Sequence, residues 1–255
     1  MYQNTASLSR VVQESVELSD AHCHLNLFEN PEAALKESIA GGLRVILATG
    51  GSALDNAQVG ELARRSEIVF GIVGISPDFA QSDAYAIDSL EEMVKKNDKI
   101  IGIGEIGLDF KVAKSEKDLF EQMAAFERQI EIAGALGLPV VIHSRGSLSE
   151  VIETLDKHKV KRAMFHFFEG DRFQAKEIEK RGWLISVPPV ENKNRKEAIR
   201  EINVKNIVVE TDSPVVGKTP LDVKRSLEMI SRIKGTGVAQ LAKVTTENLR
   251  EFFYI

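Results

Sequence analysis

Asp20-Ala21-His22-Cys23-His24-Leu25 follows the first apolar segment of this 255-residue chain and distinguishes between two α/β folds. Short apolar segments alternate with longer helical patterns along the whole sequence, as in doubly wound open sheets and in (β/α)8 barrels. An open sheet usually carries a glycine-rich phosphate-binding turn after its first strand. Here that position holds two histidines on either side of a cysteine. The stretch therefore favours a TIM-type (β/α)8 barrel.

Eight segments are predicted to be strands because they are short, apolar and in several cases rich in Val and Ile, as in Val140-Val141-Ile142. Near-continuous apolar runs of this kind are typical of parallel strands that are buried on both faces. The predicted strands are 17–24, 43–49, 68–75, 99–106, 138–143, 162–166, 182–187 and 206–210. Amphipathic patterns predict helices at 31–40, 55–65, 85–97, 116–136, 147–158, 172–181, 193–202, 220–234 and 238–252.

The chain is predicted to form a single domain over residues 1–255, because no linker-like or low-complexity stretch divides it. The barrel is expected to occupy residues 17–255. Residues 1–16 are predicted to form a short N-terminal helical extension, since their apolar residues recur at helical spacing. These residues are Leu8, Val11, Val12 and Val16.

The overall composition excludes several classes of protein. Lys and Arg total 33 against 38 Asp and Glu, so an overall basic field for nucleic acid is absent. The single cysteine, Cys23, excludes a disulfide framework. No apolar run reaches the roughly 20 residues that span a bilayer. The first twenty residues also lack a secretory pattern, so we expect a cytoplasmic protein that does not contact membranes. Nothing implies an obligate protein partner, and the oligomeric state is left open.

Histidines and carboxylates stand where the predicted strands end. In a barrel, the C-terminal ends of the strands form the catalytic face. Four histidines and two carboxylates on that face can hold one or two divalent ions and leave positions open for water. The ions compatible with these donors are Zn, Mn, Fe and Ni, with Mg as a further candidate. The predicted metal ligands are His22, His24, Glu105, His143, His166 and Asp212.

The spacing within the first motif supports this interpretation. Side chains two residues apart point to the same face of a regular strand, so His22 and His24 are expected to converge with Asp20 below them. Cys23 is expected on the opposite face as a small buried hydrophobic residue. The alternative for the histidines is hydrogen bonding within the core, but six such polar groups in one core are expensive to bury. The fifth histidine, His158, is expected on the surface.

These motifs resemble the TatD family of metal-dependent hydrolases, within the wider amidohydrolase-like group of barrels. The similarity spans residue 17 to the C-terminus. It rests on residues 20–25 together with Gly104-Glu105-Ile106-Gly107-Leu108-Asp109-Phe110, Pro139-Val140-Val141-Ile142-His143-Ser144-Arg145, Phe165-His166, Glu210-Thr211-Asp212-Ser213-Pro214 and Thr246-Glu247-Asn248-Leu249.

The resemblance implies a specific division of the ligands. His22, His24, Glu105 and Asp212 would bind one metal ion, and Glu105 would bridge to a second ion held by His143 and His166. Family members are generally deoxyribonucleases, and several cleave phosphodiester bonds from a DNA end. The resemblance thus implies a deoxyribonuclease with a DNA substrate.

Three segments depart from the family pattern near the expected substrate. A family His-Pro-His is Ser76-Pro77-Asp78 here, and the family's His-Cys-Phe-Ser-Gly is His166-Phe167-Phe168-Glu169-Gly170. Residues 215–220 replace an aromatic residue and a longer basic loop. If Asp78 and Glu169 face the site, they would repel phosphate. The substrate is therefore either DNA or a small anionic molecule, such as an amide, lactone or phosphoester. A non-catalytic metal-binding barrel is a further alternative.

The expected mechanism assigns roles to a few residues. Asp212 and Glu105 are the expected catalytic residues. Asp212 would orient the attacking water and accept its proton, while Glu105 would hold the metals together. Asp20 would orient a ligand histidine. Arg145, two residues beyond His143, is the candidate for binding an anionic substrate group, with an ion pair to Glu169 or Asp109 as the alternative.

Overall fold

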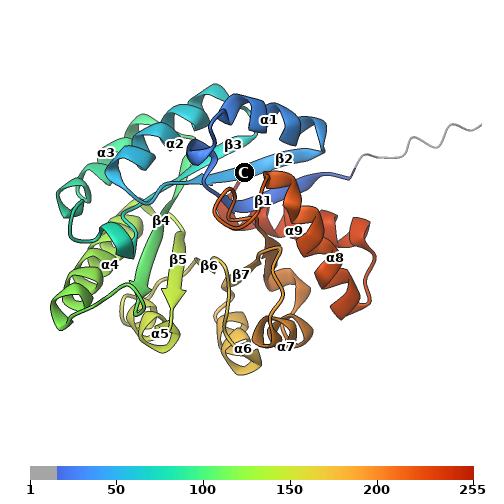
Figure 1. Cartoon of the computed structure of the whole chain (residues 1–255). Helices are drawn as coiled ribbons and strands as arrows, with labels where there is room; N and C mark the ends of the chain where they lie inside the picture. Colours follow the sequence, from blue (N-terminus) through green and yellow to red (C-terminus); the bar gives the residue numbers. More distant parts are fainter. Residues whose placement is uncertain (1–15) are drawn as a thin grey trace, which may run out of the picture.

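The computed structural model describes residues 16–255, and its eight strands form one parallel sheet in the order β1 to β8 (Figure 1). The predicted helix at residues 1–16 lies outside this part, apart from Val16. The TIM barrel predicted from the alternating pattern is confirmed. Its strands are β1 Leu18–Cys23, β2 Leu43–Thr49, β3 Val69–Val73, β4 Ile100–Asp109, β5 Val140–Arg145, β6 Ala163–Phe165, β7 Leu184–Val187 and β8 Ile207–Val209.

The helices lie outside the strands, as Figure 1 shows. The α-helices are α1 Pro31–Ala40, α2 Ala53–Arg65, α3 Ser89–Lys96, α4 Glu116–Leu136, α5 Leu148–Lys157, α6 Arg172–Lys180, α7 Lys193–Glu201, α8 Val223–Lys234 and α9 Val238–Phe253. Short 3-10 helices are η1 Leu25–Leu27, η2 Pro77–Phe79, η3 Ala84–Ala86, η4 Val204–Asn206 and η5 Pro220–Asp222. Within residues 16–255, no helix is both long and apolar enough to cross a membrane.

The ends of β1 and β8 are joined by main-chain hydrogen bonds that close the barrel at its C-terminal face. The Asp212 amide donates to the His22 carbonyl at 2.9 Å, and the His24 amide donates to the Ser213 carbonyl at 2.8 Å. Because both strands carry candidate ligands, the closure of the barrel brings the first and last motifs of the sequence together.

Two apolar layers stabilise the barrel. The outer layer packs the helices against the outward faces of the strands and includes Cys23, as expected. The inner layer fills the barrel with side chains such as Val45, Ile72 and Val141, and α9 contributes Phe252 and Phe253 to it. Burial of this kind stabilises a fold by about 25 cal/mol per Å² of apolar surface. The polar site is therefore built at one end of a filled interior.

Each predicted strand and helix overlaps an element of the structure, but most ends differ by one to four residues. The predicted helix 85–97 is a 3-10 turn followed by α3, and 220–234 is likewise η5 followed by α8. The predicted strand 99–106 continues to Asp109, because residues 106–109 pair with residues 142–145 of β5. This longer pairing depends on β5, so the residues of the fourth predicted strand did not reveal it by themselves.

Candidate metal centre

The first group of converging side chains comes from opposite ends of the chain. His22 lies in β1, His24 follows it, and Asp212 follows β8. The Nε2 atoms of His22 and His24 are 3.4 Å apart. The Asp212 Oδ1 atom lies 3.7 Å from Nε2 of His22 and 3.3 Å from Nε2 of His24. These three residues are close enough together to hold a metal ion.

The second group is formed by β4, β5 and the residue after β6. His143 Nδ1 lies 2.6 Å from Glu105 Oε1 and 3.2 Å from His166 Nε2. His166 Nε2 is also 2.9 Å from Glu105 Oε1. Glu105, His143 and His166 thus form a second cluster able to hold a metal ion.

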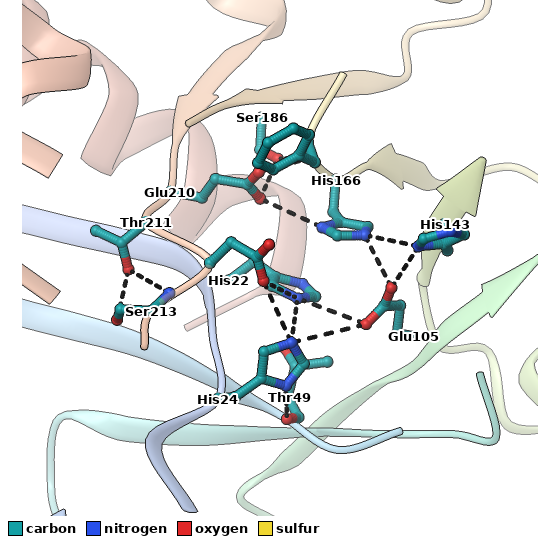
Figure 2. A network of polar contacts seen from close by, with 12 residues as sticks. His22, His24, Thr49, Glu105, His143, His166, Ser186, Glu210, Thr211 and Ser213 are labelled. Atoms are coloured by element: carbon teal, nitrogen blue, oxygen red, sulfur yellow. Dashed lines mark hydrogen bonds and ion pairs between the residues drawn. The ribbon is translucent and has the colours of Figure 1, made fainter. Parts of the chain in front are cut away.

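Glu105 contacts both groups with different oxygen atoms, as Figure 2 shows. Its Oε1 atom faces His143 and His166, whereas Oε2 lies 3.7 Å from Nε2 of His22 and 3.9 Å from Nε2 of His24. The carboxylate is almost completely buried. A single buried carboxylate therefore joins two donor clusters.

The convergence of His22 and His24 does not come from regular strand alternation. Ala21 packs in the inner apolar layer and Cys23 in the outer one, although they are two residues apart. The pairing of β1 with β2 shifts between Asp20 and Cys23, so an irregularity interrupts the alternation. Asp20 also differs from expectation. Its carboxylate accepts the amides of His22 and Thr211 and the Thr211 hydroxyl, so it holds the main chain and not an imidazole ring.

Hydrogen bonds to the outer nitrogens leave the inner nitrogens of two rings free to act as ligands. His24 Nδ1 lies 3.0 Å from the Thr49 carbonyl oxygen, and this contact requires a proton on Nδ1. His143 Nε2 lies 3.1 Å from Asp109 Oδ2 and is fixed in the same way. When the rings are neutral, the lone pairs of His24 Nε2 and His143 Nδ1 consequently face the clusters. Such outer partners are usual for metal-binding histidines, so the residues present fit a divalent ion.

The electrostatic field of the clusters also favours a cation. Burial opposes the protonation of His143, but hydrogen bonds to Asp109 and Glu105 outweigh it and raise the pKa of His143 to about 10. For His24, burial is likewise outweighed by Asp212 and Glu105, and the pKa rises to about 9. Burial would raise the pKa of Glu105, but His166 and His143 hold it well below its usual value. The carboxylates therefore stabilise positive charge at the centre.

The residues of this centre lie within a segment that matches one known family. The TatD related DNase family matches residues 19–254. This chain belongs to the TatD family. The predicted class, a metal-dependent hydrolase, is thereby confirmed at the level of the family.

Relatives from distant organisms align with this TatD chain over nearly its whole length. Uncharacterized metal-dependent hydrolase MJ1582 of Methanocaldococcus jannaschii is 30% identical and covers 93% of this chain and 97% of its own. Human Deoxyribonuclease TATDN3 is 26% identical and covers 93% of this chain and 95% of its own. The crystal structure of YJJV, a TATD homolog from Escherichia coli, superposes with a TM-score of 0.86 at 21% identity, covering 94% of this chain and 99% of that one.

A cavity of about 450 Å³ opens beside His166 in this TatD barrel. Its lining includes Arg145, Lys111 and Glu169. Arg145 is about half exposed, and its Nη1 atom lies 3.9 Å from Asp109 Oδ2. Arg145 therefore reaches solvent in the cavity while it retains a distant carboxylate partner, and both expected contacts of this residue remain compatible with its position.

The segments that depart from the usual TatD pattern lie around the opening of this cavity, which we call the mouth. Ser76 is buried, whereas Asp78 is exposed at the β3–α3 connection and lines a neighbouring cavity with Lys111. Partial burial, reinforced by Asp109 and Glu105, raises the pKa of Asp78 despite the opposing effect of His143. Glu169 is exposed in the cavity beside His166. The carboxylates of Asp78 and Glu169 thus lie near the TatD centre, at positions from which they would repel phosphate as predicted.

Sequence patterns missed two residues that contact the centre. Asp109 holds the outer nitrogen of His143, and Glu210 lies within 4.8 Å of nitrogens of both His22 and His166. Both residues belong to quoted TatD motifs, and a carboxylate at the end of an apolar strand was the signal that could have identified them. His158 was expected on the surface but is partly buried, with Nε2 3.4 Å from Glu127 Oε1. It lies away from the centre because it ends α5 at the opposite end of the barrel.

Proposed function

We propose that this TatD barrel hydrolyses phosphodiester bonds in DNA with the help of one or two divalent ions. The observation that carries the proposal is the position of Glu105 between two separate donor clusters. A shared carboxylate is suited to a two-ion site, where two ions about 3.5–4 Å apart can act on the attacking and leaving oxygens. The family supports the substrate class, since its human relative is named a deoxyribonuclease.

The proposed ligands follow from the two clusters. His22, His24 and Asp212 would hold one ion, His143 and His166 the other, and Glu105 both. When bound, divalent ions lower the pKa of water and polarise the phosphoryl oxygen. Thr49 and Asp109 keep His24 and His143 in the tautomers required for binding. The identity of the metal is left to experiment, because Zn, Mn, Fe, Ni and Mg remain compatible with the donors.

Asp212 is proposed as the general base. Its side chain is about 12% exposed, so a water molecule can reach the carboxylate. The Oδ1 atom faces His22 and His24, and the second oxygen would orient the attacking water and accept its proton. Arg145 would hold a phosphate of the substrate, because its guanidinium lies in the cavity that opens beside His166.

Hydrolysis of a small-molecule amide, lactone or phosphoester is the second candidate. The carboxylates of Asp78 and Glu169 at the mouth favour it, since like charges near a phosphate-rich polymer weaken binding. Neutral or singly charged substrates would tolerate these groups better than a DNA strand with several phosphates.

A substrate screen with metal-supplemented protein distinguishes the two candidates. Single-stranded DNA labelled at either end would be compared with chromogenic phosphodiesters, esters and lactones, each with Zn, Mn, Mg, Fe or Ni. The proposal expects stepwise shortening of DNA that chelation abolishes. Turnover of lactones or esters alone would support the second candidate. No turnover on any substrate by protein that binds metal would support the non-catalytic alternative.

A further inference from the structure

We infer that Glu210 is a positioning residue. It fixes the ring of His166 on its Nδ1 side and so keeps the Nε2 atom available as a metal ligand. The inference rests on the proposed metal-dependent function, but it concerns a residue outside the six proposed ligands. Figure 2 shows Glu210 on the other side of the His166 ring from Glu105. The two carboxylates therefore face opposite edges of the same imidazole.

The position of Glu210 is fixed by two donors. The residue is completely buried directly after β8. Its Oε1 atom accepts the Phe167 amide at 2.6 Å, and its Oε2 atom accepts the Ser186 hydroxyl at 2.5 Å. Phe167 immediately follows His166, so one of these contacts also fixes the main chain next to the proposed ligand. A side chain held this firmly can define the orientation of a neighbouring ring.

Oε2 of Glu210 also faces His166. It lies 3.8 Å from the Nδ1 atom of that ring. Within residues 16–255, this Nδ1 atom has no hydrogen-bond partner although it is buried. A buried imidazole N–H without an acceptor is costly, so the closest carboxylate oxygen is the natural partner for it. The distance between His166 Nδ1 and Glu210 Oε2 would shorten to hydrogen-bond length when the ring is fixed at its Nε2 atom.

The ring of His22 stacks on that of His166, with centroids 4.0 Å apart and planes inclined by 16°. Its Nδ1 atom is also buried and without a partner in the described part of the chain. Nitrogens of both rings lie within 4.8 Å of a Glu210 oxygen. His22 belongs to the first cluster and His166 to the second. Glu210 therefore lies next to a ring of each cluster, on the side away from Glu105, which joins the two clusters.

A carboxylate can act here in a way that an amide cannot. A carboxylate only accepts hydrogen bonds, so it requires the proton of His166 on Nδ1 and leaves the Nε2 lone pair facing Glu105. A glutamine can still accept the Phe167 amide with its carbonyl oxygen. Its NH2 group would then face Nδ1 and donate to it, which moves the ring proton to Nε2. That tautomer blocks the nitrogen proposed to bind metal.

The buried charge of Glu210 has a compensating cation nearby. Arg195 is also buried, and its guanidinium stacks over the Phe167 ring at 4.9 Å. It donates to the carbonyl oxygens of Phe168 and Val190, so it is anchored beside the segment that carries His166. Donors and a nearby cation lower the cost of burying a carboxylate, although burial raises the pKa of Glu210 to about 7 against the opposing effect of His166.

The test compares full-length Glu210→Gln with the unaltered protein, using Zn as the probe. Zn affinity would be measured by calorimetry, and the His166 Nδ1–H proton by ¹H–¹⁵N NMR, assigned through its loss in His166→Ala. We expect Zn binding to weaken roughly 10–100-fold and the Nδ1–H signal to disappear. Glu153→Gln on the exposed side of α5 is the matched control, because it makes the same carboxylate-to-amide change away from the centre; its Zn affinity should stay within a few-fold of the original.

Each outcome bears on the inference. Unchanged Zn affinity together with a retained Nδ1–H signal in folded Glu210→Gln would overturn it. Glu210→Asp checks the reach of the carboxylate and should restore part of the affinity, which a purely structural loss would not predict. If the unaltered protein bound no Zn but showed the Nδ1–H signal, and Glu210→Gln lost that signal, the proposed function would fail while the positioning role stood.

Discussion

Asp212 combines an unusual backbone conformation with a reactive position. Its φ of 50° lies in the left-handed region, which a residue with a side chain rarely adopts. Strain of this type costs about 1–3 kcal/mol and persists where surrounding contacts impose it. Here the Asp212 amide is held by the His22 carbonyl. The conformation aims the carboxylate at His22 and His24 and not along the outgoing loop.

Replacing Asp212 with asparagine tests the assignment of the general base. The amide preserves the size of the side chain and tolerates the left-handed conformation, so the fold should remain intact. Because an amide cannot accept the proton of water, we expect turnover to fall by at least about 100-fold, the usual contribution of a general base. Steady-state hydrolysis of the substrate identified by the screen, with circular dichroism as the folding control, measures this. Turnover at the original rate would show that another group is the base.

The β4–β5 pair shows how an element positions a ligand. Gly107 has a φ of 143°, and a Cβ atom at this position would lie 2.0 Å from the His143 carbonyl oxygen. The two strands can pair along residues 106–109 only because this residue has no side chain. The pairing in turn places Asp109 where it holds His143. The glycine therefore belongs to the architecture of the centre although it binds nothing.

Gly107→Ala is expected to destabilise the protein by roughly 3 kcal/mol, because it combines backbone strain with overpacking. It should also weaken metal binding, since the strand would move with His143. Gly134→Ala in α4 is the matched control. Within residues 16–255 and apart from the helix itself, no atom lies within 4 Å of the Cβ added there, so the helix should gain about 0.5–1 kcal/mol. Urea unfolding of both variants measures the difference; equal stabilities would refute the role of the close approach.

The elements also show what the sequence could and could not predict. Apolar runs such as Val140-Val141-Ile142 identified strands, and the helices of 31–40 and 116–136 were found with their exact ends. Six converging donors were predictable because a barrel gathers strand ends on one face. The irregularity in β1 was not predictable, since it arises from pairing with β2. Neither was the contact of Glu210 with His166, because it depends on how residues distant in sequence approach each other.

At the scale of the whole molecule, the C-terminal helix fills one end of the barrel. Phe252 and Phe253 of α9 pack against the inner layer, and the Phe253 ring approaches Gly102 of β4. The opposite end carries the six donors. The residues of α9 that stabilise the barrel and the six donors of the candidate centre thus lie at opposite ends of the barrel axis, as is usual in this fold.

This separation predicts that a core substitution in α9 lowers stability without altering the centre. Phe253→Ala should destabilise the protein by about 3–5 kcal/mol through the cavity that it leaves. Metal affinity of the folded fraction should be unchanged. Phe120→Ala is the control, because Phe120 is 73% exposed and its loss should cost no more than about 0.5 kcal/mol. Weaker metal binding by folded Phe253→Ala would argue against the separation.

The central claim is that the six converging side chains form a metal centre, and the metal content of the protein tests it most directly. Untagged protein would be stripped with a chelator, reloaded with Zn or Mn, dialysed and analysed by elemental mass spectrometry. We predict between one and two equivalents of metal per chain for the unaltered protein, and a loss of both ions in Glu105→Ala, because that carboxylate contacts both clusters. Far less than one equivalent in the folded, unaltered protein, with no activity restored by added metal, would contradict the account.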